Sequence, residues 1–175
     1  MALADALQEG AARHPQKIAL ITPERSWTFA EVDTAVTQLA RALVTSGLKY
    51  GDRVALHFTN SYELPVCLYA CFRAGLVAVP LNTRMKGAEL AYVLNHSGAK
   101  IYLGQSNLYS EIHESRAAVR LDDFFIVGDR TPFTDVADLA TLLIPPVMME
   151  PLLVTALPHV NEDDVAVIMY TSGTT

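Results

Sequence analysis

Two apolar runs, Val54-Ala55-Leu56-His57-Phe58 and Leu76-Val77-Ala78-Val79-Pro80-Leu81, indicate the architecture of the chain. Both runs are short, apolar and rich in aliphatic residues, which is typical of buried strands. Residues 62–74 between them have the composition of a helix, with Thr59-Asn60-Ser61 as its expected cap and Gly75 at its end. A strand, a helix and a second strand form a βαβ unit. The sequence therefore predicts a parallel sheet with a right-handed crossover.

The same alternation extends over most of the chain. Thr28 and Glu31 have the spacing of a capping box, which indicates that a long helix begins at residue 29 or 30. The pattern predicts an α/β fold with a mostly parallel sheet and flanking helices. Helices are expected over 2–13, 29–46, 86–95 and 107–119, and strands over 17–21, 26–29, 100–103 and 124–127.

We expect one domain over residues 1–175, made of three parts. Residues 1–127 form the regular α/β layer, 128–164 form an irregular proline-rich segment, and 165–175 form a strand followed by a loop. Within the irregular segment, residues 135–143 are predicted to form a short helix. The methionines of the second half are expected to be core residues, namely Met148, Met149 and Met169.

The composition excludes several classes of protein. The net charge is −6, from 13 basic and 19 acidic residues, and no basic stripe is present, which argues against a nucleic-acid partner. No apolar run approaches the ~18–20 residues that a membrane span needs. The hydrophobic content of 51% is explained by buried parallel strands, or by surface that a partner domain covers. The first residues lack the basic region of a signal peptide, so we expect a cytoplasmic protein.

Several cysteine, histidine and charged side chains are expected to have structural and not catalytic roles. Cys67 and Cys71 lie four residues apart in one predicted helix without a metal-ligand companion, so we expect buried free thiols. His57 lies between apolar residues of a strand, which favours a core histidine over a catalytic one. Arg73 and Asp52 are expected to make structural hydrogen bonds.

The last stretch is Val165-Ala166-Val167-Ile168-Met169-Tyr170-Thr171-Ser172-Gly173-Thr174-Thr175. It begins as a buried strand and turns into hydroxyl residues around one glycine. Such a loop can bring N–H groups and hydroxyls onto a phosphate, and Gly173 permits close approach of the backbone. Its composition also fits a plain surface loop. Asn82, Thr83 and Arg84 follow the carboxyl end of a strand, where open α/β sheets bind ligands, although helix capping is an alternative role.

The string Tyr-Thr-Ser-Gly-Thr-Thr at 170–175 resembles the opening of the phosphate-loop signature of the adenylate-forming superfamily. This superfamily comprises acyl- and aryl-CoA synthetases, firefly-type luciferases and the adenylation domains of peptide synthetases. Residues 27–32, 51–55 and 73–82 resemble further landmarks of these proteins. The resemblance covers essentially the whole chain, which looks like the first part of an acyl-CoA synthetase-like N-terminal domain.

The resemblance implies a set of ligands and site residues. The parent protein would use ATP, Mg²⁺ and CoA, with a small carboxylic acid as substrate. Asn82 and Arg84 are lower-ranked candidates for contact with a ligand, and neither a catalytic residue nor a metal ligand is expected in this part of the enzyme. The family's lysine, adenine, ribose and Mg²⁺ contacts would lie beyond residue 175. The ATP phosphates would be bound by Thr171, Ser172, Gly173, Thr174 and Thr175.

The function implied is that of an ATP-dependent ligase that adenylates a fatty or aryl acid, releases pyrophosphate and passes the acyl group to CoA. The chain of 175 residues by itself is predicted to be inactive. One alternative is a non-catalytic α/β module that binds a nucleotide or a protein. A second is a binding module without a phosphate site, in which residues 170–175 form a tail. The identity of the acid, the acceptor thiol and assembly into a homo-oligomer stay open.

Overall fold

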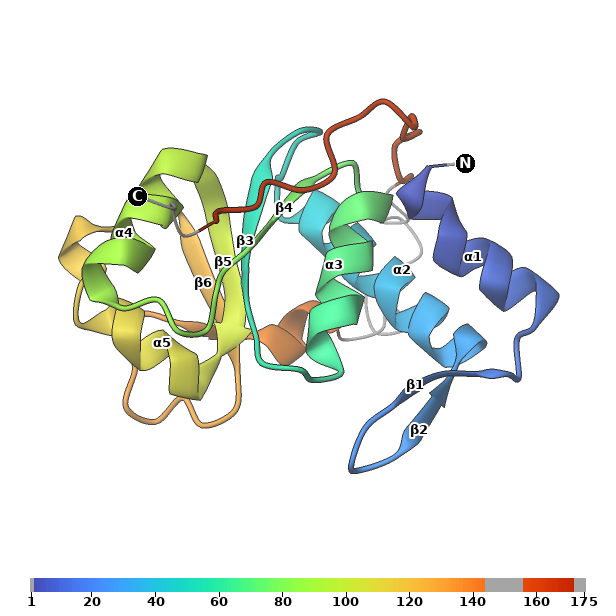
Figure 1. The fold of residues 1–175 in the computed structure, drawn as a ribbon, viewed down its shortest axis with the longest axis horizontal. Coiled ribbons are helices and arrows are strands. Elements are labelled where there is room, and N and C mark those ends of the chain that lie inside the picture. The colour runs from blue at the N-terminus through green and yellow to red at the C-terminus, as the bar shows by residue number, and fades with distance from the viewer. Residues whose placement is uncertain (1, 144–155, 172–175) are drawn as a thin grey trace.

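The structure of the chain, a computed structural model, describes residues 2–143 and 156–171. Its centre is a sheet of five parallel strands in the order β4-β3-β5-β6-β7 (Figure 1). Every strand pair in this sheet is parallel, as the βαβ pattern predicts. The strands are β3 (Arg53–His57), β4 (Val77–Pro80), β5 (Ala99–Gln105), β6 (Asp123–Val127) and β7 (Ala137–Asp138).

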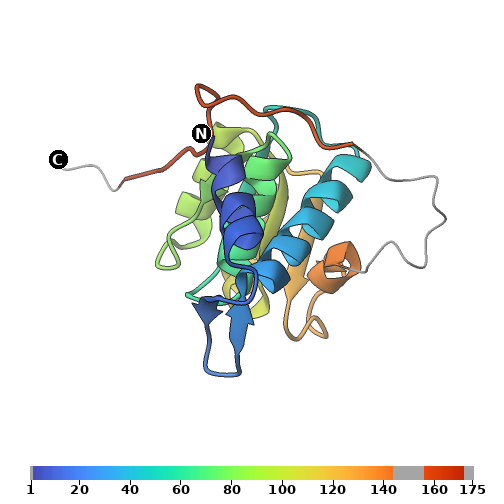
Figure 2. The ribbon, with the colours of Figure 1, turned by 90° about the vertical axis from the view of Figure 1, so that its right-hand side faces the viewer.

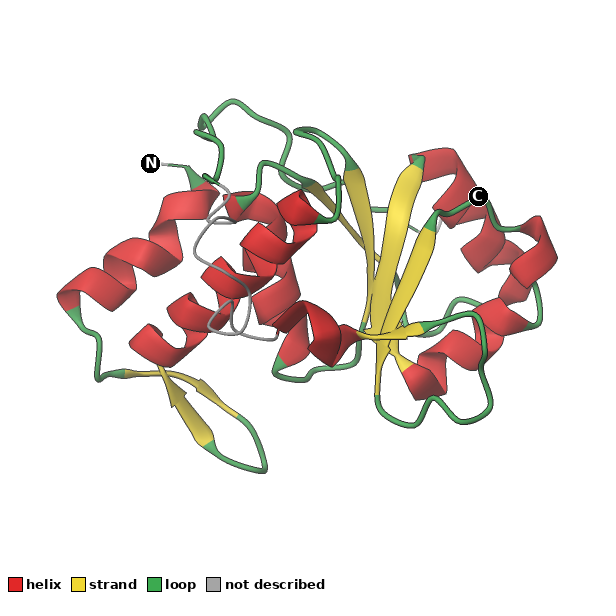
Figure 3. Cartoon of the chain, turned by 180° about the vertical axis from the view of Figure 1, so that it is seen from behind, coloured by secondary structure: helices red, strands yellow, loops and turns green. Residues whose placement is uncertain are grey.

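Helices cover both faces of the sheet, as the view from behind shows (Figure 3). On one face lie α1 (Leu3–Arg13), α2 (Phe29–Thr45) and α3 (Glu63–Arg73), and on the other lie α4 (Gly87–Ser97) and α5 (Ser106–His113). Side chains of β3 alternate between the two cores: Val54 and Leu56 pack with the first set of helices, and Ala55 packs with the second. The expected α/β architecture is therefore confirmed.

The βαβ unit forms as predicted. β3 pairs with β4 in parallel from Arg53–Val77 to Leu56–Pro80, and α3 connects the two strands. Gly75 follows α3 with a φ of +67°, a left-handed conformation that glycine adopts without steric cost. Cys67 and Cys71 of α3 are buried free thiols, and burial raises the pKa of Cys71 to about 12. Both thiols are therefore structural parts of the core.

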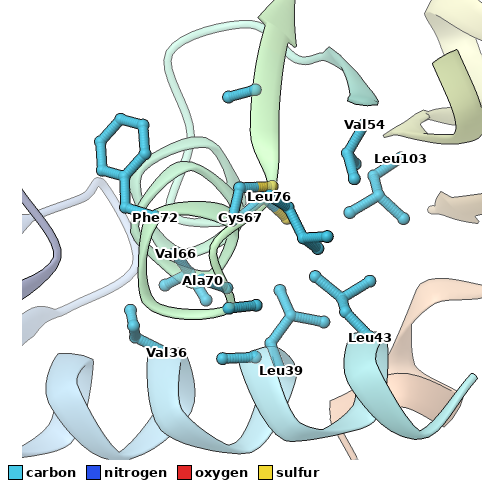
Figure 4. Packing of buried hydrophobic residues seen from close by; sticks show 14 of the residues in the cluster. Val36, Leu39, Leu43, Val54, Val66, Cys67, Ala70, Phe72, Leu76 and Leu103 are labelled. Atoms are coloured by element: carbon cyan, nitrogen blue, oxygen red, sulfur yellow. The ribbon is translucent and has the colours of Figure 1, made fainter. Parts of the chain in front are cut away.

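Helix α2 packs along α3, with aliphatic side chains between them (Figure 4). Val36, Leu39 and Leu43 of α2 are fully buried. At the edge of this contact the Arg73 guanidinium lies 2.6 Å from an Asp33 carboxylate oxygen, and it also donates to the Asp33 carbonyl at 3.2 Å. The expected structural role of Arg73 is thus confirmed: it ties the end of α3 to α2.

An antiparallel hairpin of β1 (Ile18–Ile21) and β2 (Ser26–Thr28) precedes α2 and projects from the rest of the molecule (Figures 1 and 2). The predicted capping box is present at the junction. The backbone N–H of Glu31 donates to Thr28 Oγ1 at 3.3 Å, and the backbone N–H of Thr28 donates to Glu31 Oε2 at 2.8 Å. The Glu31 carboxylate accepts from both the backbone N–H and the hydroxyl of Thr28, and these two hydrogen bonds lower the pKa of Glu31.

The prediction that Thr59-Asn60-Ser61 caps α3 was wrong. The helix begins after Tyr62, whose side chain makes no capping hydrogen bond. Thr59 instead donates from its backbone N–H and its hydroxyl to the Gln105 side-chain oxygen, both at 2.9 Å. The loop after β3 is therefore tied to the end of β5. Hydrogen bonds from this loop to the end of β5 take the place of a local cap, which sequence spacing does not reveal.

Two helix predictions differ from the structure in length or type. The stretch 107–119 is divided into α5, which ends at His113, and a 3₁₀ helix η1 (Arg116–Ala118). The stretch 135–143 is not an α-helix: it forms β7 and then a 3₁₀ helix η2 (Leu139–Leu143). The Asp138 carboxylate accepts from the backbone N–H of Ala140 at 2.9 Å, a local turn that competes with an α-helical start.

The terminal segment comprises residues 156–171; after a turn at 162–164 it runs in extended form beside the outer edge of β4 (Figure 1). One parallel bridge, Ala78 to Val167, joins it to the sheet. The expectation that Met169 is a core residue was wrong, because this side chain is 75% exposed. Met148 and Met149 lie outside the described residues. Across the described ranges, no helix combines the length and apolar character needed to cross a membrane.

Candidate functional site

The candidate site lies at the carboxyl end of β4, where the terminal segment reaches the same edge of the sheet. The backbone N–H of Ala78 donates to the Ala166 carbonyl, and the N–H of Ile168 donates to the Ala78 carbonyl, both at 2.9 Å. These two bonds align the segment in parallel with β4. The residues that follow it therefore arrive beside the loop that follows β4, the edge at which open α/β sheets bind ligands.

Three of the residues singled out from the sequence meet here. Thr171 lines a cavity of about 520 Å³ together with Asn82 and Arg84. The remaining lining comes from Tyr170, from Met85 just before α4, and from four residues of α4, namely Ala88, Glu89, Tyr92 and Val93. Ser172, Gly173, Thr174 and Thr175, the rest of the predicted phosphate loop, lie outside the described residues. The structure thus places the first residue of that loop and its two lower-ranked companions around one hollow.

Asn82 and Arg84 differ in what their side chains do. The Asn82 side-chain oxygen accepts from the backbone N–H of Arg84 at 2.9 Å, which closes an Asx turn after β4. Asn82 therefore shapes the loop and does not cap the following helix, whose N-cap is Lys86, so the alternative role in helix capping was wrong. The Arg84 side chain is exposed and makes no hydrogen bond or ion pair to any residue that the structure describes. Its guanidinium is free to meet an anion at the cavity.

His57 lies at the carboxyl end of β3 but does not line this cavity. It is fully buried, and its Nδ1 lies 3.0 Å from the hydroxyl of Tyr102. Its Nε2 has no hydrogen-bond partner among the described residues. Burial lowers the pKa of His57 to about 4, so the ring is neutral at physiological pH. The interpretation as a core histidine agrees with this environment.

Sequence reasoning missed His96, in the last turn of α4. Its Nδ1 lies 2.8 Å from the hydroxyl of Tyr170, the residue before Thr171. The two residues are 74 positions apart in the chain. No local pattern connects residues at this separation, and His96 followed by Ser97 and Gly98 indicates only the end of a helix.

A second cavity, of about 410 Å³, lies at the opposite end of β4. Gly75, Leu76 and Val77 line it, together with seven residues of the terminal segment, namely Val160, Asn161, Glu162, Asp164, Val165, Ala166 and Ile168. The Tyr50 hydroxyl donates to the Asp164 carboxylate at its rim, which raises the pKa of Tyr50 and lowers that of Asp164. This cavity is remote from Thr171, and amino ends of parallel strands are not the usual place for ligands. We therefore assign the candidate site to the carboxyl end.

The residues that the structure describes include no group of three His, Cys, Asp or Glu side chains that could hold a metal ion. The lining of the candidate site has one cationic group, Arg84, one carboxylate, Glu89, and the hydroxyls of Tyr92, Tyr170 and Thr171, of which that of Tyr170 contacts His96. Such a donor set suits an anion with several oxygen atoms.

The fold is that of an open parallel α/β protein, with a candidate anion site at the carboxyl edge of its sheet. The family of AMP-binding enzymes matches residues 7–175, and the chain belongs to this family. This match confirms the family that was predicted from residues 170–175 and from the upstream landmarks.

Similar proteins are CoA ligases. The chain is 33% identical over 169 residues to a 2-succinylbenzoate–CoA ligase of Bacillus licheniformis, an alignment that covers 97% of this chain and 31% of that protein. It is 28% identical over 153 residues to a crotonobetaine/carnitine–CoA ligase of Salmonella typhimurium, covering 86% of this chain and 29% of that protein.

Solved structures share the fold. A Mycobacterium tuberculosis fatty acyl CoA synthetase superposes with a TM-score of 0.81 at 28% identity, covering 98% of this chain and 32% of that one. An anthranilate CoA ligase in complex with anthranoyl-AMP gives 0.88 at 24% identity, covering 100% of this chain and 33% of that one. The chain thus spans about a third of the length of these relatives.

Proposed function

We propose that this chain is the first part of an ATP-dependent ligase that adenylates a carboxylic acid, releases pyrophosphate and transfers the acyl group to CoA. The observation that carries the proposal is the convergence of Thr171 with the Asn82–Arg84 loop at the carboxyl end of β4, in a member of the AMP-binding enzyme family. The CoA ligases among its relatives support CoA as the acceptor.

In this reaction a carboxylate oxygen attacks the α-phosphorus of ATP. A new O–P bond forms, the bond from the α-phosphorus to the bridging oxygen breaks, and pyrophosphate leaves with that electron pair. In the second step the CoA thiol loses its proton and attacks the acyl carbon, and AMP leaves. Catalysis of the first step consists mainly of positioning and of stabilising charge on the phosphates.

The chain's own residues would act on that charge. Thr171 and the hydroxyl residues of 172–175 would donate hydrogen bonds to the phosphate oxygens that become pyrophosphate. Arg84, exposed at the same cavity, would supply a positive charge to an anionic group of a substrate. Mg²⁺ accompanies ATP in such reactions, and the described residues include no group of three His, Cys, Asp or Glu side chains that could hold it.

The test is ATP–pyrophosphate exchange by the protein made from its complete coding sequence, with a panel of fatty and aryl acids. We expect exchange of labelled pyrophosphate into ATP that depends on at least one acid, and an acyl-CoA product when CoA is added. Absence of acid-dependent exchange across the panel would overturn the proposal.

The 175-residue chain alone should show no exchange above background, because it spans about a third of its relatives. Exchange by the isolated chain would contradict this second expectation. Micromolar binding of ATP by the isolated chain without exchange in the longer protein would favour the non-catalytic module instead.

A further inference from the structure

Among the contacts that attach the terminal segment to the rest of the described structure, three hydrogen-bonded contacts mark successive points along its length. The first is the hydrogen bond from Tyr50 to Asp164, and the second is the backbone pair around Ala78. The third is the side-chain contact between Tyr170 and His96, with 2.8 Å from the tyrosine oxygen to Nδ1. Of these three, the last is adjacent to Thr171, the first residue of the predicted phosphate loop.

The histidine is held on a rigid support. α4 buries Leu90, Val93 and Leu94 against the sheet, so its last turn is fixed relative to β4. One turn before His96, the ring of Tyr92 stacks on the imidazole, with ring centres 5.2 Å apart and planes at 22°. The Tyr170 ring meets the imidazole edge-on, with centres 5.8 Å apart. Packing therefore restricts the orientation of the imidazole from two sides.

We propose that His96 is a positioning residue that fixes the start of the phosphate loop through Tyr170. Without this contact, the last attached point of the segment would be Ile168, and the backbone of 169–171 would gain conformational freedom that ATP binding must then remove. This inference rests on the proposed function of the loop. It assigns a role to a helix residue that lies outside the loop motif.

The contact is suited to this task because both groups are adaptable. A tyrosine hydroxyl donates and accepts, and an imidazole nitrogen does either according to its tautomer. Neither side chain needs to reach the substrate. Their effect on ATP would be exerted through the position of the Thr171 backbone and hydroxyl, which precede the remaining loop residues in the chain.

The test compares His96→Phe and Tyr170→Phe in the protein made from its complete coding sequence. The first keeps a ring for stacking on Tyr92, and the second removes one hydroxyl. We expect each to lower kcat/KM for ATP by about three- to tenfold, the range that corresponds to one hydrogen bond. The double variant should lose no more than either single one, because both remove the same contact. KM for the acid should stay unchanged, and His96→Asn should restore part of the loss.

Tyr50→Phe is the matched control, since it removes a tyrosine hydroxyl that contacts the same segment at its distant end. We expect it to change kcat/KM for ATP by less than twofold. Equal losses in Tyr50→Phe and Tyr170→Phe would overturn the inference, because the contact would then act only by attaching the whole segment. Wild-type kinetics in His96→Phe and Tyr170→Phe would overturn it as well.

Hydrogen–deuterium exchange separates this inference from the proposed function. In the same variants, the amides of Ala78 and Ile168, which form the two backbone hydrogen bonds between β4 and the terminal segment, should exchange about three- to tenfold faster in His96→Phe than in Tyr50→Phe. If the wild-type protein shows no acid-dependent activity but these amides respond as stated, the proposed function fails and the positioning role stands. If the amides do not respond, the positioning role fails whatever the activity.

Discussion

Two five-residue runs of this chain are alike in sequence and differ in structure. Val54-Ala55-Leu56-His57-Phe58 includes most of β3, in which Val54 and Leu56 are 0% and 1% exposed. Val165-Ala166-Val167-Ile168-Met169 is as apolar, yet Val165 and Met169 are 65% and 75% exposed. The difference lies in their neighbours: β3 has β4 on one side and β5 on the other, whereas the terminal run is joined by one bridge to β4.

The comparison shows that an apolar run encodes the ability to become a buried strand, while burial itself requires partners on both edges and both faces. β3 has a strand on each edge and helices on each face, so its hydrogen bonds and its packing are complete. The terminal run shows the surface that such a strand presents when its outer edge has no partner among the described residues. Exposed apolar surface of this kind is characteristic of a docking edge for further chain.

The largest expected effect concerns β3, the strand with partners on both edges and both faces. Leu56→Ala removes a buried side chain from a fully packed strand and should lower the free energy of unfolding by about 2–5 kcal/mol. Met169→Ala, the matched change in the terminal run, should alter it by less than about 0.5 kcal/mol. Urea denaturation followed by circular dichroism measures both. Similar losses in the two variants would show that the terminal run is buried in solution.

A second prediction concerns acid stability and His57. The pKa of this side chain is about 4 in the folded protein, against 6.5 for an unperturbed histidine, so the unfolded state binds more protons between these pH values. Stability from this residue is therefore present above pH 6.5 and is lost as the pH falls toward 4, by up to roughly 3 kcal/mol.

Urea denaturation at several pH values in this window measures the loss. His57→Asn should flatten the dependence, whereas His159→Asn in the terminal segment should retain it, because His57 is intact. If the unfolding free energy of the wild-type protein did not change with pH in this window, the burial of His57 at the end of β3 would be contradicted.

A third prediction isolates a local signal that needs no distant partner. Thr28→Ala removes the N-cap of α2 and should cost about 1 kcal/mol of stability. Thr34→Ala, on the exposed face of the same helix, should be neutral or slightly stabilising, since alanine has the higher helix propensity. Thermal or urea unfolding of the pair measures the difference. Equal stability of the two variants would show that the capping box does not form in solution.

The smallest expected change in stability concerns the exposed terminal run, residues 165–169. Val165→Ser combined with Met169→Ser should alter the unfolding free energy by less than about 0.5 kcal/mol, because both side chains are exposed. The same double variant should reduce the fluorescence of a dye that binds apolar surface. Ile21→Ser, which changes an exposed apolar side chain of the hairpin, should reduce it less. Unchanged dye binding in the double variant would show that the dye binds apolar surface other than that of Val165 and Met169.

Local patterns predicted the regular part of the fold well, because each element there carries its own signals. The apolar runs on either side of α3 indicated the parallel pair, and Thr28 with Glu31 marked the start of α2. The failures share a different cause. Thr59 was expected to cap α3 and instead binds Gln105 of β5, 46 residues away. The stretch 135–143 was expected to be helical, but part of it pairs with β6 as β7.

The candidate site was predicted in part. Thr171, Asn82 and Arg84 were each singled out because they follow apolar runs, and the structure brings them to one cavity. The loop residues 172–175 stay predictions. The division of roles between Asn82, which closes a turn, and Arg84, whose charge is free, required side-chain geometry. So did the contact between His96 and Tyr170.

Sequence patterns alone indicated most of the helices and strands, the parallel pairing in the main sheet, and the family that the last six residues resemble. These properties follow from periodicity, caps and short motifs, all of which act within a few residues. Only the tertiary structure decided that β4 and the terminal segment lie side by side, that Met169 is exposed, and that His96 meets Tyr170. The physical reason is that hydrogen bonds and burial depend on partners brought together by folding, whatever their separation along the chain.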